Sequence, residues 1–132
     1  MPALDSVLFT RTNANGRVPT SISSGLWHLK FPASAAACPA NTSTSVDLYH
    51  DITIPVGYIG IVAPLNGDDV VGKPDIYVNS RVFLGTGTPI AAKLQVINVS
   101  ANPQTPDVGT NAAVLMILKQ DEFKPDDTVG VW

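Results

Sequence analysis

Short segments rich in β-branched and aromatic residues alternate with clusters of turn-forming residues along this chain, and no ten-residue window shows helical periodicity. The turn clusters, such as Gly85–Pro89 and Ala101–Asp107, are rich in Gly, Pro, Asn, Asp and Thr. Eight strands are predicted, at Ser6–Thr10, Leu26–Phe31, Thr44–Tyr49, Ile52–Ile54, Tyr58–Ala63, Asp75–Val78, Ile90–Val99 and Asn111–Lys119. Eight short strands in 132 residues predict a single all-β domain, either a sandwich or a barrel.

One segment, Ala112–Leu118, leaves room for a helix, because Ala, Leu and Met favour helices. A strand is preferred there, since the segment follows a Pro/Gly-containing turn and precedes a polar end. We expect residues 1–20 to form an N-terminal arm, residues 21–124 the β-domain and residues 125–132 a C-terminal tail. The tail carries Val129, Val131 and Trp132, which are unfavourable in water. These three residues are therefore expected to dock on the same chain or on a neighbouring copy.

The charge of the chain excludes some classes of partner. The formal net charge is −3, and the 8 basic residues are scattered, so the clustered positive face that nucleic acid requires is not expected. No apolar run reaches the roughly 20 residues of a membrane span, and the N-terminus does not resemble a signal peptide. Only 14% of the residues are charged, against roughly 25% in a typical soluble domain. A surface with so little charge suits a protein that assembles with other subunits.

The residues that most often bind metals or act as nucleophiles are few. Cys38 is the only cysteine and lies in a small, apolar setting, so we expect a buried structural thiol and no disulfide. His28 and His50 are the only histidines, and nothing in the sequence brings a third metal ligand to them. His50 and Asp51, close to Asp47, are expected at a solvated strand end. We therefore predict no metal and no cofactor.

One segment carries a family resemblance. Residues 57–67 read GYIGIVAPLNG. This resembles the second motif of the trimeric dUTPases, Gly-Tyr-Tyr-Gly-Arg-Ile-Ala-Pro-Arg-Ser-Gly, with both strand glycines, the tyrosine, the Ala-Pro pair and the closing glycine in register. Further segments extend the resemblance in the same order, namely Ser24–Leu29, Asp75–Leu84, Lys93–Ser100 and Gly109–Leu115. The resemblance implies a distorted jelly-roll β-sandwich that assembles as a homotrimer.

The sequence departs from that family at the positions that handle the nucleotide. The resemblance implies a third-motif carboxylate that activates the attacking water, but Leu84 stands there and cannot take a proton. The second-motif Arg and Ser that hold phosphate are replaced by Leu65 and Asn66, and the fourth-motif Asp-Arg pair reads Thr110-Asn111. The first-motif Asp and the glycine-rich C-terminal arm have no counterpart. No catalytic residue is predicted, and the chain is expected not to be an enzyme.

Three functional hypotheses follow. The leading one is a structural virion protein, a trimeric decoration or cement protein, whose partners are its own copies and the major capsid protein or other shell subunits. Its location would be the virion, and the host cytoplasm before assembly. The second is a catalytically inactive, dUTPase-related viral regulatory protein that binds host partners. The third is a divergent nucleotide hydrolase.

Overall fold

A computed structural model describes residues 7–33, 37–65 and 76–119 of the chain. Within these ranges the chain forms nine β-strands and no helix. The strands are β1 (Leu8–Arg11), β2 (Thr20–Ser23), β3 (Leu26–Lys30), β4 (Thr42–Thr53), β5 (Tyr58–Pro64), β6 (Ile76–Val78), β7 (Arg81–Leu84), β8 (Pro89–Asn98) and β9 (Asn111–Lys119).

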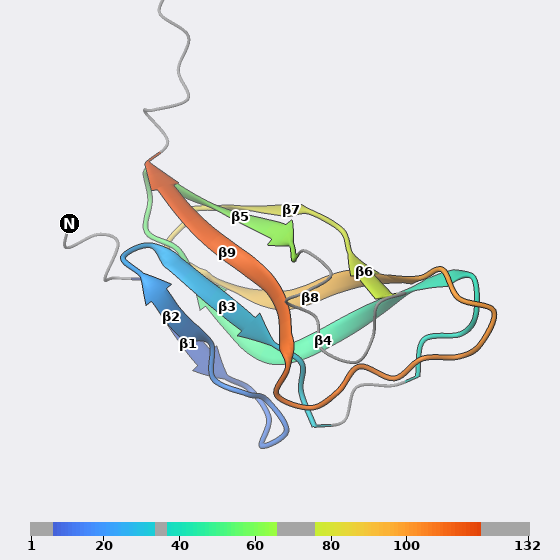
Figure 1. Ribbon diagram of the computed structural model, residues 1–132. Coiled ribbons are helices and arrows are strands. Elements are labelled where there is room, and N and C mark those ends of the chain that lie inside the picture. The colour runs from blue at the N-terminus through green and yellow to red at the C-terminus, as the bar shows by residue number, and fades with distance from the viewer. Residues whose placement is uncertain (1–6, 34–36, 66–75, 120–132) are drawn as a thin grey trace, which may run out of the picture.

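The strands form two antiparallel sheets, one layered on the other (Figure 1). One sheet has four strands in the order β1-β4-β8-β6, and the other has five in the order β2-β3-β9-β5-β7. The long strands β4 and β8 pair along most of their length, and β9 lies between β3 and β5. Between β6 and β7 the chain crosses from the four-stranded sheet to the five-stranded one. The predicted all-β sandwich is confirmed.

Strand positions agree with the prediction in most places and differ in three. Strand β9 has the predicted bounds, so Ala112–Leu118 is a strand and not the alternative helix. The two strands predicted between Thr44 and Ile54 are one strand, β4, which continues through a bulge where Tyr49 has a positive φ of 58°. Strands β2 and β7 were not predicted. Both are four-residue edge strands, and their exposed or irregular patterns carry too little local signal.

The core lies between the sheets and is formed by alternate residues of each strand. In β5, for example, Tyr58, Gly60 and Val62 point inward, while Ile59 and Ile61 lie on the opposite face. Side chains that are at most 2% exposed come from both sheets and include Leu29, Phe31, Ile52, Ile54, Val62, Phe83, Leu94, Val96 and Leu115. Only glycine fits at position 60, because a Cβ there would lie 2.6 Å from Ile54 Cδ1 and clash with the core.

The buried amide of Asn98 links the segment before β4, at Cys38 and Pro39, to the loop after β8, at Ser100 and Asn102. Its Nδ2 donates to the carbonyl oxygens of Cys38 (2.9 Å) and Asn102 (2.8 Å), with a longer contact to that of Pro39 (3.3 Å). Its Oδ1 accepts from the backbone N–H (2.9 Å) and the hydroxyl (2.8 Å) of Ser100. Asn98 also begins an Asn-x-Ser glycosylation pattern, but its side chain is fully buried and is not available for modification in the folded protein.

Candidate functional site

The outer face of the five-stranded sheet is apolar. The strand register places three rows of side chains on it, and their members are half-buried or exposed. We call this surface the apolar outer face, and it consists of Leu84, Ile59 and Leu118 in the first row, Val82, Ile61, Met116 and Leu26 in the second, and Ala63 and Val114 in the third. His28 is the register partner of Val114 and borders the third row. No charged side chain interrupts the three rows.

The other sheet presents a different surface. On its outer face Ser45 pairs with Gln95 and Asp47 with Lys93, while Ser43 lies opposite Ile97, which Tyr77 of β6 flanks. This face is therefore mostly polar, as a sheet face that meets water normally is, with Ile97 and Tyr77 as its apolar members. The apolar outer face therefore differs in composition from a sheet face that meets water.

The positions that resemble nucleotide-handling motifs lie at two opposite ends of the five-stranded sheet. At one end, Leu65 directly follows β5, and Asn111 begins β9 beside Lys30 of β3. At the other end, Leu84 of β7 is the register partner of Ile59. Leu65 lies six positions after Ile59 along extended chain, which corresponds to about 20 Å. A single copy of the chain therefore does not bring the second-motif and third-motif positions together.

Lys30 contributes an ammonium group to the first end. Lys30 Nζ donates to Asn111 Oδ1, and Thr110 Oγ1 donates to the carbonyl oxygen of Asp107 (2.7 Å). The side chain of Leu65 offers neither charge nor a hydrogen bond. Sequence reasoning did not single out Lys30, because its place beside Asn111 depends on the pairing of β3 with β9. The ammonium of Lys30 is bound to an amide, and neither Leu65 nor Asn111 can take a proton from water.

The second end exposes apolar side chains beside Lys119, the exposed register partner of Tyr58. Leu84 is 60% exposed, and Val56 in the neighbouring turn is 75% exposed. The tyrosine of the motif, Tyr58, is buried, so its ring packs in the core. These side chains offer no proton acceptor to a water molecule and no ligand to a metal ion.

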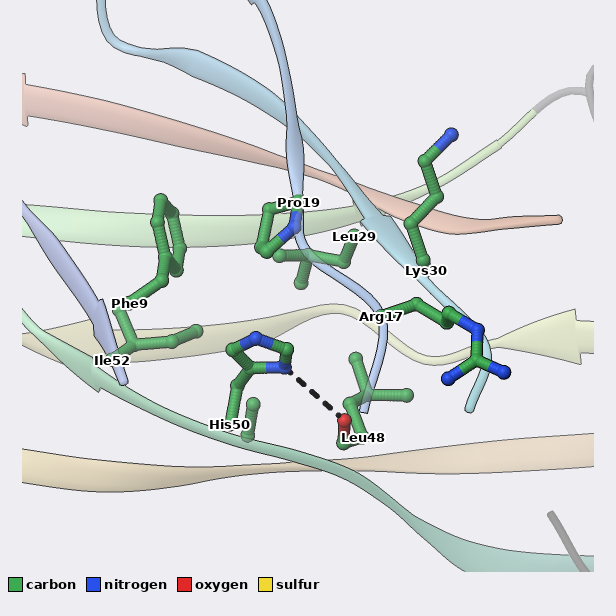
Figure 2. Close-up of a pocket in the computed structure, with 9 residues that line it drawn as sticks. Phe9, Arg17, Pro19, Leu29, Lys30, Leu48, His50 and Ile52 are labelled. Atoms are coloured by element: carbon green, nitrogen blue, oxygen red, sulfur yellow. Dashed lines mark hydrogen bonds between the residues drawn. The ribbon is translucent and has the colours of Figure 1, made fainter. Parts of the chain in front are cut away.

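A small cavity of about 10 Å³ lies between the sheets near His50. Figure 2 shows the imidazole ring among Phe9, Pro19 and Leu48, while the charged ends of Arg17 and Lys30 point away from it. The ring Nδ1 lies 3.4 Å from the carbonyl oxygen of Leu48. The cavity has room for at most about one water molecule.

The prediction that His50 lies at a solvated strand end is wrong, since the side chain is only 4% exposed. Strand β4 continues past Tyr49 as one strand, and its two-residue alternation buries His50 together with Leu48 and Ile52. His28 lies on a different sheet, beside the apolar outer face, so the two histidines do not form a pair.

The remaining candidates are structural or lie outside the described ranges. Cys38 is buried as predicted; burial raises the pKa of its thiol, and a hydrogen bond with Thr44 opposes that rise. Among residues 7–33, 37–65 and 76–119, no three His, Cys, Asp or Glu side chains gather as a metal site would require. The same ranges contain no helix able to cross a bilayer. Asn66 and the three predicted docking residues Val129, Val131 and Trp132 fall outside those ranges.

Comparison with known proteins defines the class of fold. No protein-family model and no curated protein matches the sequence. Solved structures do match: a variant of the Staphylococcus bacteriophage 80alpha dUTPase has a TM-score of 0.72 at 12% identity, covering 92% of this chain and 94% of that chain. A second variant, with dUpNHpp, gives 0.70 at 14% identity with the same coverage. The dUTPase from phage phi11 of S. aureus gives 0.69 at 13%, covering 92% and 93%.

The chain therefore has a dUTPase-like fold, which confirms the fold that the motif resemblance implied. At 12–14% identity the likeness defines the fold alone.

Proposed function

We propose that this chain is a non-enzymatic structural protein of a virion, a homotrimer that decorates or cements the capsid shell. The observation that carries the proposal is the apolar outer face, because a large apolar sheet surface is stable in water only when it is covered. The occupant we propose is a second copy of the chain. In a closed trimer each of the three copies buries this face against a neighbour. The threefold symmetry of the trimer also matches the threefold positions of an icosahedral shell.

The chemistry of the motif positions supports a role without catalysis. Leu65 and Leu84 stand where the resembled family handles phosphate and water, and neither side chain takes a proton or donates a hydrogen bond. Loss of a general base alone typically lowers a rate by 10² to 10⁴, roughly. Loss of the phosphate contacts adds to that, because charge-assisted donors supply much of the stabilisation in phosphoryl transfer.

We expect the purified protein not to hydrolyse dUTP in the presence of Mg²⁺. Release of pyrophosphate would be followed over hours at micromolar protein, with a phage dUTPase assayed in parallel as the positive control. The expected rate equals that of buffer alone. A rate that rises with protein concentration and saturates with dUTP would contradict this prediction and favour the divergent nucleotide hydrolase.

We expect light scattering on the native protein to give a mass near three times 13.9 kDa. Val82→Lys should shift the particle toward the monomer, because an unpaired ammonium in an apolar interface is strongly unfavourable. Val108→Lys is the matched control: both valines are exposed, at 56% and 51%, but Val108 lies on the loop between β8 and β9. It should leave the mass unchanged.

Two outcomes would defeat the trimer proposal. One is a wild-type mass of 13.9 kDa at micromolar concentration. The other is equal dissociation by both lysine variants, which would mean that added charge acts without regard to position. Circular dichroism of each variant would show that the sheets are retained. Composition of purified virions tests the shell role separately, and absence of the chain from intact particles would refute it.

A second candidate function is a regulatory protein that binds host partners. The observation that favours it is that matching solved structures are described as phage dUTPases that control transfer of virulence genes by a proto-oncogenic G protein-like mechanism. Such a role needs a free surface on the protein outside a particle. Finding the chain only in the soluble fraction of infected cells, and never in virions, would favour this function over the structural one.

A further inference from the structure

An open concavity of about 330 Å³ lies where the chain leaves one sheet for the other. Strand β6 pairs with β8 only as far as Val78, and the turn through Asn79 and Ser80 then leads into β7. The concavity lies beside the part of β8 that β6 no longer covers. Its lining is formed by Ser45, Asn79, Ser80, Arg81, Lys93, Leu94 and Gln95. Only one of these seven side chains is apolar.

Arg81 is held in place on the inner side of this concavity. Its guanidinium carbon lies 4.3 Å from the centre of the Phe83 ring, so the planar group lies over the aromatic face. One Nη also donates to the backbone carbonyl oxygen of Lys93. A guanidinium has five N–H donors, so several remain for a ligand. Because two contacts already fix the group, binding an anion would order it little further.

The other polar groups complement this guanidinium. Lys93 adds a second positive charge, and Ser45 and Ser80 add hydroxyl donors. Gln95 is committed in part, since its Nε2 donates to Ser43 Oγ (2.8 Å). None of the seven lining residues is acidic, although the chain as a whole carries more acidic than basic residues. Two of the 8 basic residues of the chain thus line this one concavity.

One carboxylate must be weighed against this positive charge. Asp47 is the register partner of Lys93 across β4 and β8. Its Oδ1 accepts from the backbone N–H of Tyr49 (2.7 Å), and it is not part of the lining. Asp47 therefore lowers the positive electrostatic potential of the concavity without occupying it. A neutral residue in its place should strengthen anion binding.

We propose that this concavity binds the phosphate group of a small molecule, with Arg81 and Lys93 as its cationic ligands. A guanidinium beside hydroxyl donors fits an oxyanion that accepts several hydrogen bonds at once. The volume exceeds that of a phosphate ion, so a phosphate ester fits as well as the free ion. The lining contains none of the nucleotide-handling positions Leu65, Leu84, Thr110 and Asn111, and the proposal does not depend on the proposed structural role.

Titration of ¹⁵N-labelled full-length protein with inorganic phosphate tests the proposal. We expect saturable shifts of the backbone amides of Asn79, Ser80 and Gln95 at constant ionic strength. Lys93→Gln and Arg81→Gln should each weaken binding at least tenfold, and Asp47→Asn should strengthen it. Arg11→Gln, on the exposed edge strand β1, is the matched control and should leave affinity unchanged. Thermal unfolding of each variant would identify any loss of folding, and because Lys93 is exposed we expect its replacement to leave the fold intact.

Three results would overturn the proposal: shifts that do not saturate, equal weakening by Arg11→Gln and Lys93→Gln, or equal shifts with acetate at matched ionic strength. The last would mean that any anion is attracted by charge alone. Ribose 5-phosphate in place of inorganic phosphate separates the two sources of the phosphate group. Tighter binding of the ester assigns the site to a phosphorylated metabolite, and equal binding assigns it to the free ion.

Discussion

Replacing Asn98 with alanine is expected to lower the free energy of unfolding by about 3–5 kcal/mol, a large part of the roughly 5–15 kcal/mol that holds a domain together. The buried amide bonds to backbone groups of Cys38, Asn102 and Ser100, at 2.8 to 2.9 Å. Truncation removes four hydrogen bonds of 2.8 to 2.9 Å at once, and each contributes about 0.5–1.5 kcal/mol. The carbonyl oxygens of Cys38 and Asn102 keep the Gln104 N–H and the Ser100 hydroxyl as donors, but among the described residues no other acceptor fixes the Ser100 N–H.

Asn102→Ala is the control for this prediction. Asn102 belongs to the same network but contributes its backbone carbonyl and N–H, while its side chain is exposed. Its replacement should change the free energy of unfolding by less than about 0.5 kcal/mol. Urea unfolding followed by tryptophan fluorescence measures both variants. Similar losses in the two would mean that the loops, and not the buried amide, set the stability of this region.

Gly85→Ala is expected to destabilise the fold by more than about 4 kcal/mol or to prevent soluble expression. An added Cβ would lie 2.1 Å from the carbonyl oxygen of Pro55 and 2.2 Å from that of Tyr58. Both contacts are with backbone atoms, so no side-chain rotation relieves them. The Gly85 N–H also donates to the same Tyr58 oxygen at 2.8 Å, and the shift needed to make room would break that bond.

Gly87→Ala separates this steric effect from the conformational freedom of glycine. Gly87 has a positive φ of 75°, but an added Cβ would meet nothing closer than Val56 Cγ2 at 3.8 Å. The strain of a left-handed alanine should cost only about 1–2 kcal/mol. Thermal unfolding of the two variants provides the comparison. A Gly85→Ala protein as stable as Gly87→Ala would show that the turns can separate, contrary to the packing described here.

Features that depend on neighbouring residues were predicted correctly from the sequence, and features that depend on distant residues were not. Strand β9 was located with its correct bounds because its turn and its apolar run are both local. Strand β2 was missed, since its four residues are all exposed and only pairing with β3 holds them extended. His50 was misplaced because the prediction divided β4 into two strands and left His50 between them, whereas the regular alternation of one continuous strand places it on the core side with Leu48 and Ile52.

The candidate sites show the same division. The residue types at Leu65 and Leu84 were evident from the motif, and they support the expectation that the chain is not an enzyme. That the two positions lie at opposite ends of β5 follows only from the register of the five-stranded sheet. The proximity of Arg81 to Lys93 was not foreseeable either, because they come from different sheets and meet where β6 ends.

The sequence by itself determined the β class, the positions of most strands and the residue types at the motif positions. These features depend on the two-residue alternation of side chains and on local turn chemistry, which neighbouring residues specify. Only the tertiary structure decided which strands are neighbours, which side chains share the apolar outer face and which polar groups meet at the concavity. Strand order and register arise from pairing between segments far apart in the chain, and local preferences do not specify such pairing.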